Sequence, residues 1–135
     1  MARIIMADDD EIVCELVSDT LRAHGHAVGF LGNGEDALKV LKARKPDLAI
    51  LDCNMPGLSG LLLVRKMRDM PDLWDMPVLM LTGRTSRSDR DLALFEGAND
   101  YMTKPFDPEE LVFRVEELLA AKARKAAPPH QLRRA

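Results

Sequence analysis

The chain has 135 residues, 47% of them hydrophobic, so it is long enough to bury one core and does not comfortably hold two domains. Its 19 basic and 22 acidic residues give a net charge of −3, which argues against a main role in binding nucleic acid or an acidic membrane. No apolar run approaches the roughly 18–20 residues of a membrane span, and the N-terminus lacks a signal-peptide pattern. The sequence therefore predicts a cytoplasmic protein.

Short apolar runs alternate with helical patterns from end to end. The runs predict strands at residues 3–7, 26–31, 47–52, 77–81 and 99–103. Apolar residues recur at helical spacing from Ile12 to Leu21, Ala37 to Leu41, Leu62 to Met67 and Leu111 to Leu119, and a more polar helix is expected around 87–96. Near-continuous apolar strands are typical of parallel sheets covered on both faces. Five βα units therefore predict an α/β fold, a doubly wound five-stranded parallel sheet.

Some single residues can be interpreted from their positions in the chain. Ile12 and Leu16 share the helical spacing of the first helix, Cys14 lies on its apolar face, and Trp74 is interpreted as a packing residue. Cys53 is not matched by a histidine at a suggestive position, so both cysteines are interpreted as packing residues rather than nucleophiles. The first strand runs into its helix without a G-x-G-x-x-G or P-loop pattern, which excludes nucleotide cofactors bound in those modes.

Charged side chains stand where three of the strands end. Asp8 and Asp9 follow the first strand, Asp52 ends the third, and Lys104 follows the fifth. Because the carboxyl ends of parallel strands line one crevice, these groups are expected to converge. Two unit charges about 4 Å apart interact by roughly 4 kcal/mol at an effective dielectric near 20, so gathered carboxylates need a cation or a raised pKa. A functional site explains this arrangement better than stability does.

The ligand atoms in this crevice favour a hard divalent cation. Asp8, Asp9 and Asp52 offer only oxygen, which Mg²⁺ prefers, whereas transition metals prefer histidine or cysteine. A Mg²⁺ beside a carboxylate, with Lys104 opposite, matches the needs of phosphoryl transfer, because both cations neutralise the transferred group. Thr82, at the end of the fourth strand, would add a hydroxyl donor on the same rim.

Taken singly, some of these residues have simpler interpretations. Asp10 suits the N-terminus of a helix, Asp52 alone could be a helix cap, and Lys104 alone would be a surface lysine. Their occurrence together at strand ends favours a site.

Four blocks of the sequence closely resemble the receiver domain of two-component response regulators. They are IIMADDD at 4–10, DLAILDCNMPGLSG at 47–60, PVLMLTG at 77–83 and GANDYMTKPF at 97–106. The resemblance covers roughly residues 3–120, and the four blocks in this order are highly specific. It implies a flavodoxin-like (βα)5 fold with strand order 2-1-3-4-5. It also implies a phosphorylation-activated signalling switch that catalyses only its own phosphorylation and dephosphorylation.

The resemblance also implies the roles of the acidic residues. Asp52 resembles the phospho-acceptor, which takes a phosphoryl group from a histidine kinase or a histidine phosphotransfer protein. Asp8, Asp9 and Asp52 resemble the Mg²⁺ ligands, together with the backbone carbonyl of Asn54. Asn54 and Arg84 flank the site, where they could orient or exclude the attacking water.

The remaining site residues resemble the family's switch. Thr82 and Lys104 resemble the hydroxyl and the ammonium that bind the phosphoryl oxygens, and the Lys104–Pro105 bond is implied to be cis. Tyr101 resembles the aromatic residue that swings inward as Thr82 moves toward the phosphoryl group. Gly83 stands where the family usually has alanine, but it is equally small, so access to the site is retained.

The C-terminal part most resembles receivers joined to winged-helix DNA-binding domains, which form homodimers through ion pairs across the fourth helix, fifth strand and fifth helix. Charged positions of that pattern are matched by Arg90, Asp100, Glu110 and Arg114. Asn99 and Ala121 stand where an acid and an arginine are usual, so two positions of the set are not matched. Exposed ion pairs contribute about 0–1 kcal/mol each, so the loss of some of them is expected to weaken a dimer through this face.

The receiver domain is expected to span residues 1–121, and residues 122–135 to form a basic, proline-containing linker or tail. No acidic residue follows Glu117, and Pro128–Pro129 would stop a helix. This composition fits a helix end with basic residues, followed by a linker, better than a nucleic-acid-binding tail. The sequence is compatible with a covalently attached output domain.

Two other functions remain as alternatives. A Mg²⁺-dependent phosphatase that passes through an aspartyl phosphate usually has a second acid two residues after its nucleophile, where this chain has Asn54. A pure interaction module with a vestigial site is the other alternative, although none of the required groups is missing.

Overall fold

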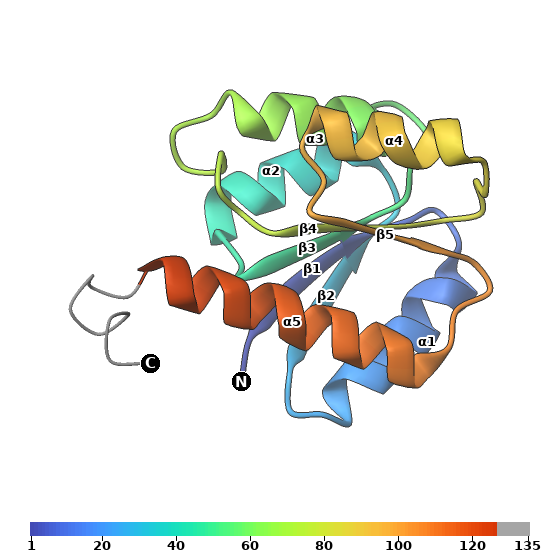
Figure 1. The fold of residues 1–135 in the computed structure, drawn as a ribbon, viewed down its shortest axis with the longest axis vertical. Helices are drawn as coiled ribbons and strands as arrows, with labels where there is room; N and C mark the ends of the chain where they lie inside the picture. Colours follow the sequence, from blue (N-terminus) through green and yellow to red (C-terminus); the bar gives the residue numbers. More distant parts are fainter. Residues whose placement is uncertain (127–135) are drawn as a thin grey trace.

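The computed structural model describes residues 1–126 and contains one sheet with helices on both faces (Figure 1). The elements are β1 (Arg3–Ala7), α1 (Glu11–Arg22), β2 (Ala27–Leu31), α2 (Gly34–Arg44), β3 (Leu48–Leu51), α3 (Gly60–Arg68), β4 (Val78–Thr82), α4 (Arg87–Glu96), β5 (Asp100–Thr103) and α5 (Pro108–Ala126). All paired strands are parallel, and their order is β2-β1-β3-β4-β5. The predicted flavodoxin-like fold is confirmed, and each strand end lies within one residue of its predicted position.

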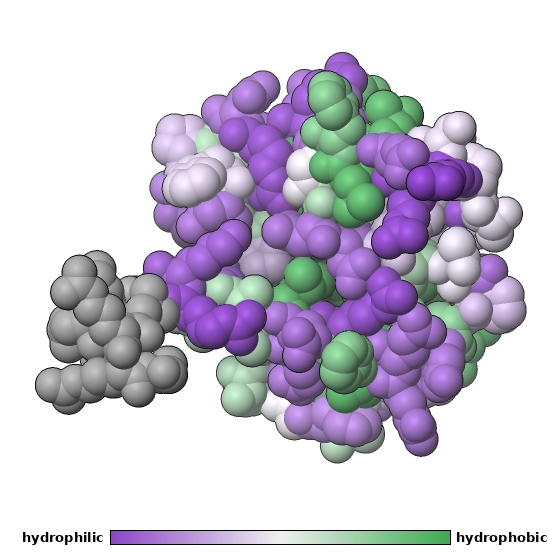
Figure 2. All heavy atoms as spheres, in the orientation of Figure 1, coloured by the Kyte–Doolittle hydropathy of each residue, from purple (hydrophilic) through white to green (hydrophobic). Residues whose placement is uncertain are grey.

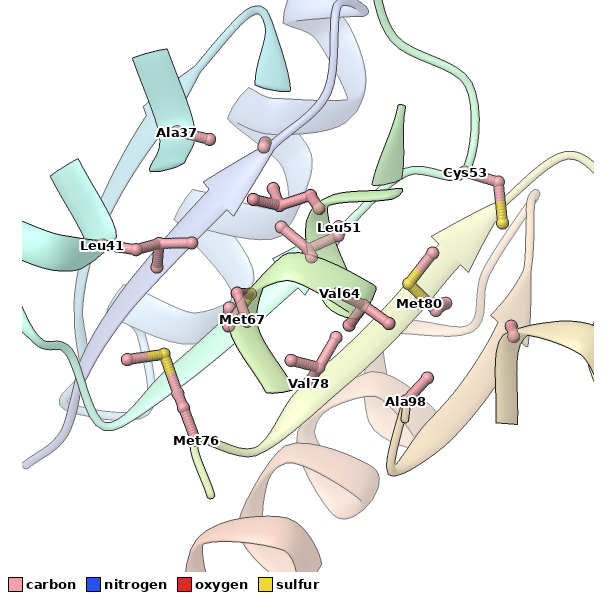
Figure 3. Packing of buried hydrophobic residues seen from close by; sticks show 14 of the residues in the cluster. Ala37, Leu41, Leu51, Cys53, Val64, Met67, Met76, Val78, Met80 and Ala98 are labelled. Carbon is pink, nitrogen blue, oxygen red and sulfur yellow. The ribbon is translucent and has the colours of Figure 1, made fainter. Parts of the chain in front are cut away.

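The core forms two layers, one on each face of the sheet. Helices α2, α3 and α4 cover one face, and α1 and α5 cover the other (Figure 1). Figure 3 shows the first layer, where side chains of α2 and α3 meet those of β3 and β4, including Leu41, Leu51, Val64, Met67, Val78 and Met80. Both β3 and β4 are buried along their whole length, which explains their unbroken apolar sequences.

The pairing of β1 with β3 places two of the acidic residues side by side. Ala7 pairs with Leu51, so the residues that follow them, Asp8 and Asp52, leave the sheet at the same level. The Asp52 N–H donates to the Ala7 carbonyl at 3.0 Å, which extends the ladder by one step. The backbone therefore fixes where both carboxylates begin.

The pairing of β4 with β5 does the same for the hydroxyl and the ammonium. Thr82 pairs with Thr103, and the Lys104 N–H donates to the Thr82 carbonyl at 2.8 Å. The Lys104–Pro105 peptide bond is cis, as the resemblance implied. Lys104 thus leaves the sheet beside Thr82, at the same edge as the acidic residues.

Ile12, Leu16 and Trp74 lie on the surface. Ile12 and Leu16 are 71% and 53% exposed, because α1 turns the face with Cys14 and Val17 toward the sheet. The apolar stripe of α1 is wider than the face that the sheet covers. Trp74, interpreted as a packing residue, is 60% exposed.

Helix α5 extends farther than the predicted domain. It continues to Ala126, so the predicted end of the domain at residue 121 falls inside a helix. The rest of the predicted tail, 127–135, lies outside the described residues. No helix within residues 1–126 combines the length and the apolar character needed to cross a bilayer.

Gly60, the first residue of α3, packs against the backbone of the Asp52 loop. A Cβ on Gly60 would lie 1.9 Å from the Asp52 carbonyl oxygen, so Gly60→Ala must displace α3 or the end of β3. We expect this variant to lose about 1–3 kcal/mol of unfolding free energy, as overpacked sites do. Gly83→Ala is the control, because its Cβ would meet no atom within 4 Å. Equal midpoints of the two variants in urea unfolding would contradict the prediction.

Candidate functional site

Three carboxylates converge at the C-terminal edge of the sheet. One oxygen from each of Asp8, Asp9 and Asp52 lies within 4.8 Å of the other two. Asp8 and Asp52 are buried whereas Asp9 is exposed, so the cluster is reached from solvent on the Asp9 side. A set of carboxylate oxygens of this kind fits a hard divalent cation. The structure thus brings together the three acidic residues that the sequence singled out.

Asp8 is fixed by hydrogen bonds to both of its oxygens. Its Oδ1 accepts from the backbone N–H of Asp10 at 3.0 Å, and its Oδ2 accepts from Lys104 Nζ at 2.6 Å. Burial raises the pKa of the Asp8 carboxyl, and the bonds from Lys104 and Asp10 oppose this rise. The negative charge of Asp52 raises the pKa of Asp8 further. Asp8 therefore carries its charge at a cost to the folded state.

Lys104 lies between the two buried carboxylates. Its Nζ is 2.6 Å from Asp8 Oδ2 and 3.6 Å from Asp52 Oδ2. Burial alone would lower the pKa of Lys104, but the hydrogen bond that Lys104 donates to Asp8 and the charge of Asp52 outweigh burial and raise this pKa. The ammonium therefore remains charged at neutral pH, yet one positive charge does not balance three carboxylates.

Thr82 and Tyr101 lie beside this cluster, and both contact the backbone of Arg84. Thr82 is buried, and its Oγ1 accepts from the Arg84 N–H at 3.3 Å. The Tyr101 hydroxyl donates to the Arg84 carbonyl at 2.8 Å. Tyr101 points inward and is only 5% exposed, and burial raises its pKa to about 12. The hydroxyl therefore stays protonated and can act as a donor at neutral pH.

Asn54 forms the outer wall of the site. Its backbone N–H points at Asp52 Oδ1 from 3.5 Å, and its side-chain oxygen accepts from Arg84 Nη2 at 2.7 Å. The predicted role of its backbone carbonyl as a metal ligand stays a prediction.

Sequence reasoning placed Arg84 beside the site but predicted neither its contact with Asn54 nor its contact with Asp89. Arg84 Nη1 donates to Asp89 Oδ1 at 3.1 Å, in the first turn of α4. The only signal in the sequence was the Ser86-x-x-Asp89 pattern, which is typical of a helix N-terminus. That pattern predicts the start of α4 but not a contact with the loop before it.

Two residues have the simpler roles that the sequence suggested. Asp10 is the N-cap of α1, and its carboxylate accepts from the backbone N–H groups of Ile12 and Val13. Cys53 is 1% exposed, and burial raises the pKa of its thiol, which makes it a poor nucleophile. Cys53 therefore packs in the core, as predicted.

Known proteins resemble this chain in sequence and in structure. The family model of the response regulator receiver domain matches residues 4–116. The chain is 39% identical over 119 residues to the phosphate regulon transcriptional regulatory protein PhoB of Rhizobium meliloti, covering 88% of this chain and 52% of that protein. It is 41% identical over 117 residues to the response regulator MprA of Mycolicibacterium vanbaalenii, covering 87% and 50%. The chain thus spans about half the length of these curated relatives.

Solved structures show the same likeness. The BeF3-activated N-terminal receiver domain of Klebsiella pneumoniae RstA has a TM-score of 0.82 and 33% identity, covering 87% of this chain and 97% of that one. The chemotaxis protein CheY4 of Vibrio cholerae has a TM-score of 0.82 and 31% identity, covering 87% and 98%. The chain therefore belongs to the receiver-domain family of two-component response regulators, and its likeness to receivers of transcriptional regulators is confirmed.

The crowding of the carboxylates predicts that removing one of them stabilises the metal-free protein. Charges within 4.8 Å repel by roughly 3–4 kcal/mol at an effective dielectric near 20, and Lys104 offsets only part of this. In a chelating buffer at pH 7, the unfolding free energy of Asp8→Asn should exceed that of wild type by about 1–2 kcal/mol. Each kcal/mol should raise Tm by roughly 3–5 °C.

The pH dependence of this gain follows from the raised pKa of Asp8. As the pH falls through that pKa, wild-type Asp8 takes up a proton and loses the buried charge, so the two proteins should converge in Tm. Asp9→Asn, at an exposed position, is the control and should gain less. Thermal unfolding that ranks Asp8→Asn below wild type at pH 7 would refute the argument.

Proposed function

We propose that this receiver domain is a phosphorylation-activated switch, in which Asp52 accepts a phosphoryl group from a histidine kinase or a histidine phosphotransfer protein. The observation that supports this most strongly is the convergence of Asp52 with Asp8, Asp9 and Lys104 at one edge of the sheet. Such a concentration of negative charge lowers stability unless a cation binds to it, so a role in binding a cation for phosphoryl transfer explains it.

We assign Mg²⁺ to this cluster as its cofactor. Asp8, Asp9 and Asp52 would hold it, together with the backbone carbonyl of Asn54. When bound, Mg²⁺ supplies positive charge that neutralises oxygens of the phosphoryl group. Asp8 suits this task because Lys104 and a backbone N–H already fix the direction of its carboxylate.

In the proposed transfer, an oxygen of the Asp52 carboxylate forms a bond to phosphorus while the phosphorus–nitrogen bond of a phosphohistidine breaks. The electron pair of that bond leaves with the imidazole, and Asp52 becomes an acyl phosphate. Lys104, 3.6 Å from Asp52 Oδ2, would pair with a phosphoryl oxygen. Attack of water on phosphorus would later break the new phosphorus–oxygen bond, restore the carboxylate and release inorganic phosphate. The domain would thus catalyse only its own modification and its reversal.

The proposed switch uses Thr82 and Tyr101. A phosphoryl group adds charge and three acceptor oxygens, which would draw the Thr82 hydroxyl away from Arg84. Tyr101 already points inward here, so in this proposal the movement of Thr82 would hold Tyr101 in that position under α4. A shift from 1:99 to 99:1 takes about 5.5 kcal/mol, which several charge-assisted hydrogen bonds can supply.

The alternative of a phosphatase that acts on small substrates gains no support. Its general acid would stand at Asn54, but a side-chain amide has no group that ionises near neutral pH and so cannot serve as a general acid or base. The Asn54 side-chain oxygen is already bonded to Arg84 at 2.7 Å. We therefore favour the switch.

We also propose that a basic, proline-containing linker follows the receiver domain and joins it to an output domain. The relatives support this proposal, because the matched part is about half of each of them. Because residues 122–126 belong to α5, we propose that the linker begins after this helix.

The direct test is phosphorylation by a small phosphodonor such as acetyl phosphate in the presence of Mg²⁺. Asp52→Asn should show no gain of phosphoryl mass, because a neutral amide is not a nucleophile, whereas wild type should be labelled. Asp91→Asn, at an exposed position on α4, is the control and should be labelled like wild type. Equal labelling of Asp52→Asn and wild type in intact-mass spectra would remove Asp52 from the role.

We propose the face formed by α4, β5 and α5 as the output surface. Figure 2 shows this face as largely hydrophilic, with apolar side chains over α4, where Leu92, Leu94 and Phe95 are exposed. Arg114 Nη1 is 2.8 Å from Asp100 Oδ1, and its Nη2 is 2.7 Å from Glu110 Oε1, all within one chain. Arg114 thus already has two acidic partners before any second molecule arrives.

A homodimer through this face is therefore expected to be weak. Sedimentation at micromolar concentration should show mainly monomer, with or without beryllofluoride and Mg²⁺. Asn99→Asp combined with Ala121→Arg would supply the missing pair twice in a symmetric dimer, and should tighten association by up to about thirty-fold. A wild-type dimer that is already tight and persists in high salt would show that ion pairs at this face do not limit dimerisation.

A further inference from the structure

Arg84 lies where three segments meet: the loop that follows Asp52 and contains Asn54 (the acceptor loop), the end of β4 and the start of α4. Its guanidinium donates from Nη2 to Asn54 Oδ1 at 2.7 Å and from Nη1 to Asp89 Oδ1 at 3.1 Å. One side chain therefore ties the residue two positions after Asp52 to the first turn of α4.

The backbone of the same residue contacts both proposed switch residues. The Arg84 N–H donates to Thr82 Oγ1 at 3.3 Å, and the Arg84 carbonyl accepts from the Tyr101 hydroxyl at 2.8 Å. A movement of Arg84 would therefore alter the surroundings of Thr82 and Tyr101 together.

The helix end of this tie is held in place by the cap of α4. Asp89 Oδ2 accepts from Ser86 Oγ at 2.7 Å, and the Asp89 N–H donates back to Ser86 Oγ at 3.1 Å. The bonds from Ser86 and Arg84 lower the pKa of Asp89, so it is ionised at neutral pH. Arg84 thus faces a charged, oriented carboxylate that belongs to the helix N-terminus.

We propose that Arg84 exchanges one anion for another: Asp89 in the arrangement seen here, and the phosphoryl group when Asp52 is phosphorylated. This inference rests on the function proposed above. A phosphoryl group offers more negative charge than one carboxylate and has three acceptor oxygens, and the planar guanidinium suits bidentate contacts with it. Once Arg84 turns toward Asp52, the first turn of α4 loses its tie to the acceptor loop.

The exchange predicts opposite effects for the two members of the pair. Without the charge of Asp89, Arg84 is free to meet the phosphoryl group, so a phosphoryl mimic should bind more tightly. Without Arg84, a donor to the phosphoryl oxygens is lost, so the mimic should bind more weakly. If the pair only stabilised the fold, both variants would bind the mimic more weakly.

The experiment is titration with beryllofluoride at a fixed Mg²⁺ concentration, followed by calorimetry and fluorine NMR. Asp89→Asn keeps an acceptor oxygen for Ser86 and should lower the Kd about two- to five-fold, the size expected for one exposed ion pair. Arg84→Gln should raise the Kd roughly three- to ten-fold. The double variant should bind like Arg84→Gln alone, because no guanidinium remains for Asp89 to hold.

Asp91→Asn is the charge-matched control. It removes one negative charge from the exposed surface of the same helix, and among residues 1–126 Asp91 has no hydrogen bond or ion pair with Arg84. An effect of Asp89→Asn that equals that of Asp91→Asn, or that weakens binding, overturns the exchange. Failure of wild type to bind beryllofluoride would instead overturn the proposed function, so the two failures can be told apart.

Discussion

The parallel pairing of β1 with β3 is the constraint on which the rest of this molecule depends. It aligns Ala7 with Leu51, and so sets Asp8 beside Asp52 in a buried position with Lys104 between them. Repulsion of roughly 3–4 kcal/mol between neighbouring charges is a large share of the 5–15 kcal/mol that typically holds a domain together. The fully buried β3 and β4 offset that cost, because nearly all of their apolar surface contributes to the core.

The strands and the acidic site could be predicted because both follow from one-dimensional patterns. A strand that is covered on both faces needs apolar side chains at every position, and therefore appears as an unbroken run with sharp ends. The charged residues stand at those ends, and the parallel topology brings the ends together. The role of Asp10 as a helix cap was equally predictable, because a helix cap depends only on its near neighbours in the chain.

Other features could not be predicted, because they depend on how elements meet in space. Periodicity shows that α1 is amphipathic, but it does not show which part of a wide apolar stripe the sheet will cover, so the exposure of Ile12 and Leu16 does not follow from it. Trp74 is exposed because the loop before β4 turns it outward, and loop paths leave little trace in composition. The contact of Arg84 with Asp89 depends on the same kind of loop geometry.

Lys104 lies closer to Asp8 than to Asp52, and this difference distinguishes the roles of the two buried carboxylates. Its ammonium lies 2.6 Å from Asp8 but 3.6 Å from Asp52, whose other oxygen has only a long 3.5 Å contact from the Asn54 N–H. A carboxylate that accepts one hydrogen bond on each oxygen is well oriented and still keeps a free lone pair on each oxygen, which suits a metal ligand. A carboxylate with weak contacts keeps its lone pairs available, which suits a nucleophile. The geometry therefore favours Asp8 as the fixed ligand and Asp52 as the acceptor, although both are buried aspartates at the ends of adjacent strands.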